Sequence, residues 1–173
     1  MTGTTIYLGL GSNRGDRLAN LQAASAALAP AVRVLRHSSV YETEPWGYVE
    51  QARFLNMALE AETELAPAAL LQHIKQVEQQ VGRVASFRYG PREIDVDILL
   101  YADLQLELQS VLGGAEHTLQ IPHPRLAERA FVLVPLAELA PELPVPGSGR
   151  SVSQLLAQQD SSGVVLLDSG AGQ

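Results

Sequence analysis

The spacing of apolar residues in the first 101 positions alternates between the period of a strand and the period of a helix. Local signals support the helix boundaries, because Pro30 follows the first helical stretch, Pro67 opens the second and Gly82 follows it. Strands are predicted at 6–10, 32–43, 54–63 and 94–101, and helices at 18–28 and 67–81. The order β-α-β-β-α-β predicts a split βαβ arrangement with helices packed on a mainly antiparallel sheet.

The C-terminal residues add further elements to this core. A strand or hairpin is predicted within 103–111, a partly helical stretch within 125–139 and a short helix within 151–158. We expect one α+β domain over 1–167 with a ferredoxin-like βαββαβ core and C-terminal additions, and a disordered tail over 168–173.

Composition narrows the classes of function. The chain has no cysteine, which excludes a thiol nucleophile, disulfides and cysteine-bound metal. A net charge of −7 argues against a nucleic-acid partner. The longest apolar run, 130–137, is far shorter than the roughly 20 residues of a membrane span, and the first residues carry no basic segment. We therefore expect a cytoplasmic protein without membrane contact, and a monomer because no heptad pattern is present.

Two aspartates form the most distinctive local feature. Asp95 and Asp97 are expected on one face of a strand, opposite the apolar residues Ile94, Val96 and Ile98. Carboxylates this close raise each other's pKa unless a cation lies between them, and Mg²⁺ binds one or two carboxylates together with waters and phosphates. The pattern fits a Mg²⁺ site, and it also fits an ordinary solvated strand face.

Three arginines precede the aspartates. Arg83, Arg88 and Arg92 lie within ten residues that contain no acid, in a chain with eleven arginines and one lysine, Lys75. Guanidinium groups match phosphate oxygens in bidentate geometry, so arginines beside a Mg²⁺ site are typical of phosphoryl transfer. Residues 84–91 are predicted to be a loop that closes over a nucleotide. A surface loop with three solvated arginines is the alternative.

Other phosphate motifs are absent or incomplete. No Gly-Lys-Ser/Thr sequence is present, which excludes a Walker P-loop. Gly9 and Gly11 start a dinucleotide fingerprint, but Arg14 stands at its third glycine position, so close backbone packing is the preferred interpretation. His123 lies between two prolines, which can orient its side chain toward a ligand. An aromatic slot with one amide, suited to a flat heterocycle, is a further hypothesis, with ordinary core packing as its alternative. Its candidate residues are Trp46, Phe54, Asn56 and Phe131.

Several ordered motifs give the chain a resemblance to a known family. These motifs are LGLGSN at 8–13, SVYETEPWG at 39–47, FLNM at 54–57, GRV at 82–84, GPREIDVDILLY at 90–101, and PHP at 122–124 followed by RAFVL at 129–133. The chain resembles the 6-hydroxymethyl-7,8-dihydropterin pyrophosphokinases of folate biosynthesis from Tyr7 to about Pro144. It departs from well-known bacterial members in a slightly shorter loop between Arg83 and Arg92 and in Tyr89, where those members often carry tryptophan.

The resemblance implies a transferase, EC 2.7.6.3, that moves the β,γ-pyrophosphoryl group of ATP to the pterin hydroxymethyl group and releases AMP. It implies that Asp95 and Asp97 bind two Mg²⁺ ions, and that Arg83 and Arg92 act with them in catalysis by stabilising charge on the triphosphate. The implied ATP contacts are Glu78, Arg88, Arg92, Ile98, His123 and Arg129. The implied pterin contacts are Thr43, Glu44, Pro45, Trp46, Phe54, Asn56 and Phe131.

Two hypotheses compete with pyrophosphoryl transfer. A ferredoxin-like scaffold hosts many functions, so a non-catalytic binding module would bind nucleotide or pterin without forming AMP. A Mg²⁺-dependent nucleotide hydrolase would break down ATP regardless of the pterin.

Overall fold

The computed structural model describes residues 3–45, 50–82 and 91–167. The N-terminal elements are β1 (Thr4–Ser12), α1 (Arg17–Ala27), β2 (Val32–His37), β3 (Tyr41–Thr43), β4 (Phe54–Thr63), α2 (Pro67–Val81) and β5 (Asp95–Tyr101). The C-terminal elements are β6 (Leu106–Leu112), β7 (Ala115–Ile121), the 3-10 helix η1 (Leu126–Glu128), α3 (Ala130–Leu139), β8 (Pro144–Val145), β9 (Arg150–Ser151), α4 (Val152–Leu156) and β10 (Val164–Leu166). Among the described residues, no helix is long and apolar enough to cross a membrane.

The main sheet is antiparallel and has the strand order β10-β3-β4-β1-β5, with β2 also paired to β4. This order confirms the predicted α+β, ferredoxin-like arrangement, in which the first strand lies between the third and fourth of the core. Strand β4 and helix α2 begin and end where the sequence pattern predicts. Gly82 ends α2 in the left-handed region at φ 105°, where glycine has no steric cost.

The strand predicted over 32–43 is two strands, because Ser38 interrupts the pairing with β4. The Ser38 backbone N–H donates to the carbonyl of Ala58 at 2.9 Å, and the Ser38 hydroxyl accepts from the Ala58 N–H at 2.8 Å. A side chain thus takes the place of a backbone acceptor, and the chain turns there before β3 resumes pairing with β4.

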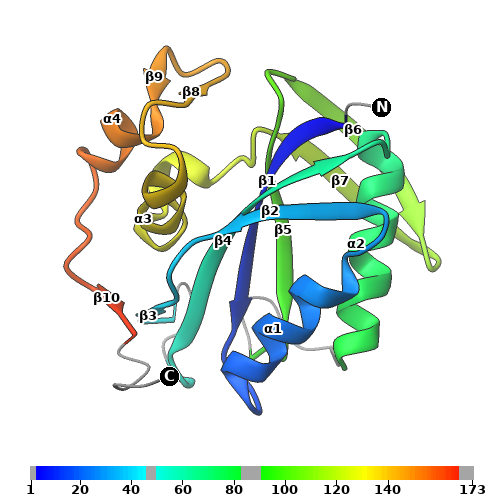
Figure 1. Cartoon of the computed structure of the whole chain (residues 1–173), viewed down its shortest axis with the longest axis horizontal. Helices are drawn as coiled ribbons and strands as arrows, with labels where there is room; N and C mark the ends of the chain where they lie inside the picture. Colours follow the sequence, from blue (N-terminus) through cyan, green and yellow to red (C-terminus); the bar gives the residue numbers. More distant parts are fainter. Residues whose placement is uncertain (1–2, 46–49, 83–90, 168–173) are drawn as a thin grey trace.

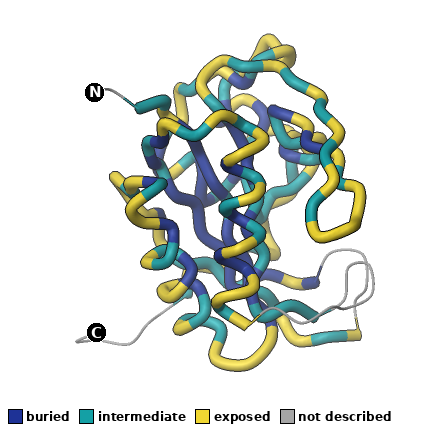
Figure 2. The backbone as a smooth tube through the Cα atoms, turned by 90° about the vertical axis from the view of Figure 1, so that its right-hand side faces the viewer, coloured by how far each residue is buried: buried dark blue, intermediate teal, exposed yellow. Residues whose placement is uncertain are grey.

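Helices cover both faces of the sheet (Figure 1). Helices α1 and α2 pack on one face around Leu8, Leu21 and Ile74, and α3 and α4 pack on the other around Leu99 and Leu133. The buried strands run through the middle of the molecule, with exposed residues concentrated at its periphery (Figure 2). The C-terminal additions therefore form a second layer of helices beyond the predicted core.

The C-terminal helices form within the predicted ranges, with α3 inside 125–139 and α4 beginning after Ser151, which makes a capping box with Gln154. Strands β6 and β7 form a hairpin that is longer than predicted, because its second strand lies beyond the predicted range 103–111. Strand β10 is unpredicted: it leaves the C-terminal layer and joins the edge of the main sheet beside β3. The predicted tail over 168–173 lies outside the described residues.

Candidate active site

One cavity of about 330 Å³ brings together most of the candidate residues. It lies between β1, β4 and β5 on one side and the start of α3 on the other. Its predicted lining residues are Thr43, Glu44, Phe54, Asn56, Arg92, Asp95, Asp97, His123, Arg129 and Phe131. Gly9, Leu10, Gly11, Met57, Ala58, Lys75, Leu99 and Val132 complete it.

The two aspartates lie at one end of this cavity, opposite two glycines. Asp95 pairs with Gly11 and Asp97 with Gly9 across the β1–β5 pair. Side chains directly opposite in an antiparallel pair contact each other, and because both partners are glycines, no β1 side chain covers either carboxylate from the opposite position. The predicted close backbone packing is also found, because a Cβ at Gly11 would lie 2.8 Å from the Asn56 Oδ1.

The electrostatics of this end are those of an acidic pair beside cations. Burial, followed by the charge of Asp95, raises the pKa of Asp97 to about 8, and Arg129 and Lys75 act in the opposite direction. The Arg92 Nη1 lies 3.7 Å from the Asp95 Oδ1. The two carboxylates therefore repel each other, and the nearby cationic side chains offset part of this repulsion.

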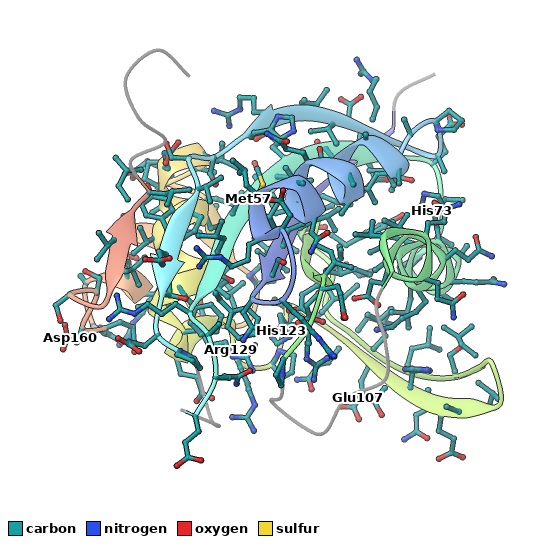
Figure 3. The ribbon with its side chains drawn as sticks, turned by 90° about the horizontal axis from the view of Figure 1, so that it is seen from below. Met57, His73, Glu107, His123, Arg129 and Asp160 are labelled. Atoms are coloured by element: carbon teal, nitrogen blue, oxygen red, sulfur yellow. The ribbon has the colours of Figure 1, made fainter. Side chains whose placement is uncertain are left out.

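His123 faces the aspartates as a neutral ring. Its Nε2 lies 4.0 Å from the Asp97 Oδ1. Burial, assisted by Arg129, lowers the pKa of His123 to about 4. We therefore treat this contact as a neutral imidazole beside a carboxyl group and not as an ion pair at neutral pH. The labelled residues His123 and Arg129 lie next to each other below the centre of Figure 3, and both line the cavity.

The other end of the cavity combines aromatic rings with a buried amide. The Asn56 Nδ2 donates a 2.7 Å hydrogen bond to the Thr43 Oγ1, which links neighbouring strands β4 and β3. Phe54 and Phe131 line the same space, and the Arg129 guanidinium lies 5.5 Å from the Phe131 ring centroid. Three of the four residues of the predicted aromatic slot thus line the cavity, and Trp46 lies outside the described residues.

Comparison with known proteins decides the family. The sequence model of 7,8-dihydro-6-hydroxymethylpterin-pyrophosphokinase (HPPK) matches residues 7–141. The chain belongs to the HPPK family. It is therefore a transferase of the pyrophosphokinase class.

Relatives of similar length support this membership. A 2-amino-4-hydroxy-6-hydroxymethyldihydropteridine pyrophosphokinase of Methylorubrum extorquens is 45% identical over 163 residues, which cover 93% of this chain and 97% of the relative. A protein of the same name from Bacillus subtilis is 43% identical over 150 residues, covering 86% and 85%.

Solved structures of HPPK-DHPS proteins share the fold. The wild-type Plasmodium falciparum HPPK-DHPS structure aligns with a TM-score of 0.73 at 16% identity, over 90% of this chain and 41% of that one. An HPPK-DHPS in complex with substrates aligns with a TM-score of 0.72 at 14% identity, over 90% and 43%. This chain thus spans less than half of these solved chains.

The acidic pair of this HPPK-family chain fits the expected Mg²⁺. Asp95 and Asp97 offer oxygen ligands in one cavity, and the repulsion between their charges, which adds to burial in raising the pKa of Asp97, is one that a bound cation would relieve. Among the described residues, no group of three or more His, Cys, Asp or Glu side chains forms a complete protein cage. A site with two carboxylates suits Mg²⁺, because this ion completes its remaining coordination positions with waters and phosphate oxygens.

Not every predicted HPPK contact faces the cavity. Glu78 is buried in α2 and its Oε2 accepts a 2.9 Å hydrogen bond from the Val96 N–H. The Ile98 side chain packs in the core with α1 and α2. Pro45 is buried and does not line the cavity. Their ligand contacts stay predictions, as do those of Arg83 and Arg88, which lie outside the described residues with loop residues 84–90.

Two residues that support this site were not predicted. Lys75 lines the cavity, and its Nζ lies 3.2 Å from the Glu78 Oε1. Asn13 exchanges hydrogen bonds with the Arg92 backbone, accepting at Oδ1 from the Arg92 N–H at 2.8 Å and donating its own N–H to the Arg92 carbonyl at 3.0 Å. The single lysine of the chain was a visible signal for Lys75, whereas the role of Asn13 depends on contacts 79 residues apart.

Proposed function

We propose that this chain transfers the β,γ-pyrophosphoryl group of ATP to the hydroxymethyl group of 6-hydroxymethyl-7,8-dihydropterin. The observation that carries the proposal is one cavity with an acidic, cation-flanked end and an aromatic end with a buried amide. The first end suits a Mg²⁺-bound triphosphate and the second suits a flat heterocycle. Membership of the HPPK family makes these two ligands the expected pair.

The aromatic end would bind and orient the pterin. The side chains of Thr43 and Asn56 provide polar groups for the edge of the ring, and Phe54 and Phe131 provide surfaces for stacking. A pterin held between these groups would direct its hydroxymethyl oxygen toward the phosphates, which removes much of the entropic cost of a two-substrate reaction.

The charged end would stabilise the reacting phosphates. The pterin hydroxyl oxygen forms a bond to the β-phosphorus while the bond from that phosphorus to the α,β-bridging oxygen breaks. AMP leaves with the bridging oxygen, and the hydroxyl proton passes to water. Lys75, Arg92 and Arg129 contribute positive charge around the triphosphate. Two Mg²⁺ ions held by Asp95 and Asp97 would supply charge neutralisation and orientation of phosphate oxygens.

The direct test is product analysis with each component omitted in turn. Purified protein is mixed with ATP, Mg²⁺ and 6-hydroxymethyl-7,8-dihydropterin, and the nucleotides are separated. We expect AMP only when all three are present. ADP, or ATP breakdown without the pterin, would favour a hydrolase, and binding of the pterin without any nucleotide product would favour a binding module.

Two aspartates, one inside the cavity and one outside it, provide matched variants. Asp97→Asn removes one carboxylate from the cavity, and we expect a loss of AMP formation of at least about a hundredfold because charge stabilisation of the transferred group is weakened. Asp103→Asn makes the same chemical change at an exposed position outside the cavity and should retain wild-type turnover. Equal activity of the two variants would contradict the proposed role of Asp97.

The monomeric state and the cytoplasmic location stay predictions.

A further inference from the structure

Among the described strands of the main sheet, β10 is the one that lies wholly beyond residues 7–141, the part matched by the HPPK family. It pairs antiparallel with β3 in the register Val164–Thr43, Val165–Glu42 and Leu166–Tyr41. Figure 1 shows it at the end of the long C-terminal excursion through α4, beside the short β3. A segment more than 100 residues away in sequence thus borders the strand that leads into the cavity.

Strand β3 carries part of the proposed pterin site. Thr43 is its last residue and lines the cavity together with Glu44. The strand is only three residues long, with β4 along one edge and β10 along the other. Without β10, its outer backbone groups would form an open sheet edge, which is prone to fraying in so short a strand.

The side chains of β10 contribute little to the core. Val165 is 55% exposed and Leu166 is 59% exposed. Because burial of apolar surface supplies most folding free energy, this strand acts mainly through its backbone pairing with β3. Its loss should therefore change β3 more than it changes the stability of the whole chain.

A second contact holds the other end of the same segment. The Glu138 carboxylate of α3 accepts a 2.8 Å hydrogen bond from the Ser39 N–H and a 2.6 Å hydrogen bond from the Tyr41 hydroxyl. Helix α3 also carries Phe131, on the opposite wall of the aromatic end. Strand β3 is thus fixed to α3 at its start, whereas its Thr43 end depends on β4 and β10.

We propose that β10 is a positioning element that holds β3 so that Thr43 presents its hydroxyl to the pterin. The inference rests on the proposed function. No residue of β10 lines the cavity, so β10 acts on the site through β3. Its effect is assigned to the pterin end and not to the phosphate end, because β5, which carries the aspartates, is three strands away from β3.

The hydrogen-bond pattern supplies a matched pair of variants. The Leu167 N–H donates to the Val40 carbonyl at 2.8 Å. Hydrogen-bonded pairs alternate along an antiparallel ladder, so the Val165 N–H faces β3 and the Leu166 N–H faces away from it. Val165→Pro removes a ladder donor, whereas Leu166→Pro places the ring at a position without one, which an edge strand tolerates.

The test compares the KM values of the two substrates in both variants. We expect Val165→Pro to raise the KM for 6-hydroxymethyl-7,8-dihydropterin about tenfold, with the KM for ATP and the Tm near wild type. Leu166→Pro should stay within about twofold of wild type for both substrates. Amide hydrogen exchange of Tyr41–Thr43 should accelerate in Val165→Pro alone. A chain ending at Gly163 provides a second variant. Because it also removes Leu167, which packs against the main core, we expect the same selective rise in the KM for the pterin together with a lower Tm.

The possible failures are distinguishable. A wild-type protein that neither binds the pterin nor forms AMP would overturn the proposed function. Wild-type activity combined with an unchanged pterin KM in Val165→Pro and in the truncated chain would overturn the positioning role of β10. Equal losses for pterin and ATP, together with a large fall in Tm, would show that β10 serves general stability and would also overturn it.

Discussion

The Glu78 carboxylate accepts a 2.9 Å hydrogen bond from the backbone N–H of Val96, the residue between Asp95 and Asp97. Glu78 is 1% exposed, and its other oxygen lies 3.2 Å from the Lys75 Nζ. Val96 lies on β5, the edge strand of the described sheet, which pairs with β1 along one side. Its N–H points toward the side without a strand partner. A buried carboxylate of α2 therefore takes the place of a neighbouring strand at the point where the two aspartates project into the cavity.

Substitution of Glu78 should separate its hydrogen bond from its charge. Glu78→Ala leaves the Val96 N–H without its acceptor and should lower the free energy of unfolding by about 1–3 kcal/mol. Glu78→Gln keeps an acceptor oxygen and should lose less. Urea denaturation of both variants measures this difference. Equal stability of Glu78→Ala and the wild type would contradict a stabilising role for the Glu78–Val96 hydrogen bond.

The buried hydroxyls of Thr43 and Thr63 allow a matched test of the pterin site. Thr43 accepts from Asn56 in the cavity, whereas Thr63 donates to the Ala31 carbonyl at 2.9 Å away from it. Thr43→Val removes the acceptor of the Asn56 amide, at a cost of about 1 kcal/mol, whereas Thr63→Val removes two hydrogen bonds, because the Thr63 hydroxyl also accepts from the Leu65 N–H at 3.1 Å. We expect Thr63→Val to lose at least as much stability as Thr43→Val, but only Thr43→Val to raise the pterin KM, by about tenfold. A raised pterin KM in Thr63→Val would show that the effect is not specific to the cavity.

Substitution of Gly11 should damage the pterin end by steric contact. The added Cβ of Gly11→Ala would lie 2.8 Å from the Asn56 Oδ1 and 3.5 Å from the Phe54 Cδ1, so the amide must move. The Cβ of Gly9→Ala would meet only the end of the Leu99 side chain, at 3.3 Å, which can shift more easily. Pterin affinity measured by calorimetry should fall further in Gly11→Ala than in Gly9→Ala, and the reverse order would refute this steric account.

The Tyr7–Glu60 contact predicts a pH dependence of stability. The Tyr7 hydroxyl donates a 2.6 Å hydrogen bond to Glu60, and burial, together with this contact, raises the pKa of Tyr7 from 10.0 to about 12. The folded chain therefore holds this proton more tightly than the unfolded chain. The resulting stability is fully present below pH 10 and is lost as the pH rises to about 12.

Tyr7→Phe should isolate that contribution. Removal of the hydroxyl should lower the free energy of unfolding by about 1 kcal/mol at pH 8, because one hydrogen bond is lost. The difference between wild type and variant should shrink from pH 10 to pH 12, where the wild type alone loses the contribution of Tyr7. Denaturation at several pH values measures this difference, and a constant difference up to pH 12 would contradict the assignment.

Features that depend on neighbouring residues could be predicted from the sequence. Alternation along 54–63 predicted β4, the stripe after Pro67 predicted α2, and the spacing of Asp95 and Asp97 placed both on one face of β5. These predictions succeeded because side chains repeat their direction every two residues in a strand and every 3.6 residues in a helix, so the spacing of apolar residues indicates the element. The motifs around them were sufficient to indicate the family.

Contacts between groups far apart in the sequence became known from the folded structure. The break at Ser38 depends on Ala58, the position of Arg92 depends on Asn13, and the outer partner of β3 is the C-terminal strand β10. The raised pKa of Asp97 likewise depends on burial and on charges from several elements. Such relationships arise from packing between segments far apart in the chain, and local periodicity contains no information about which of the available partners a backbone or carboxyl group will find.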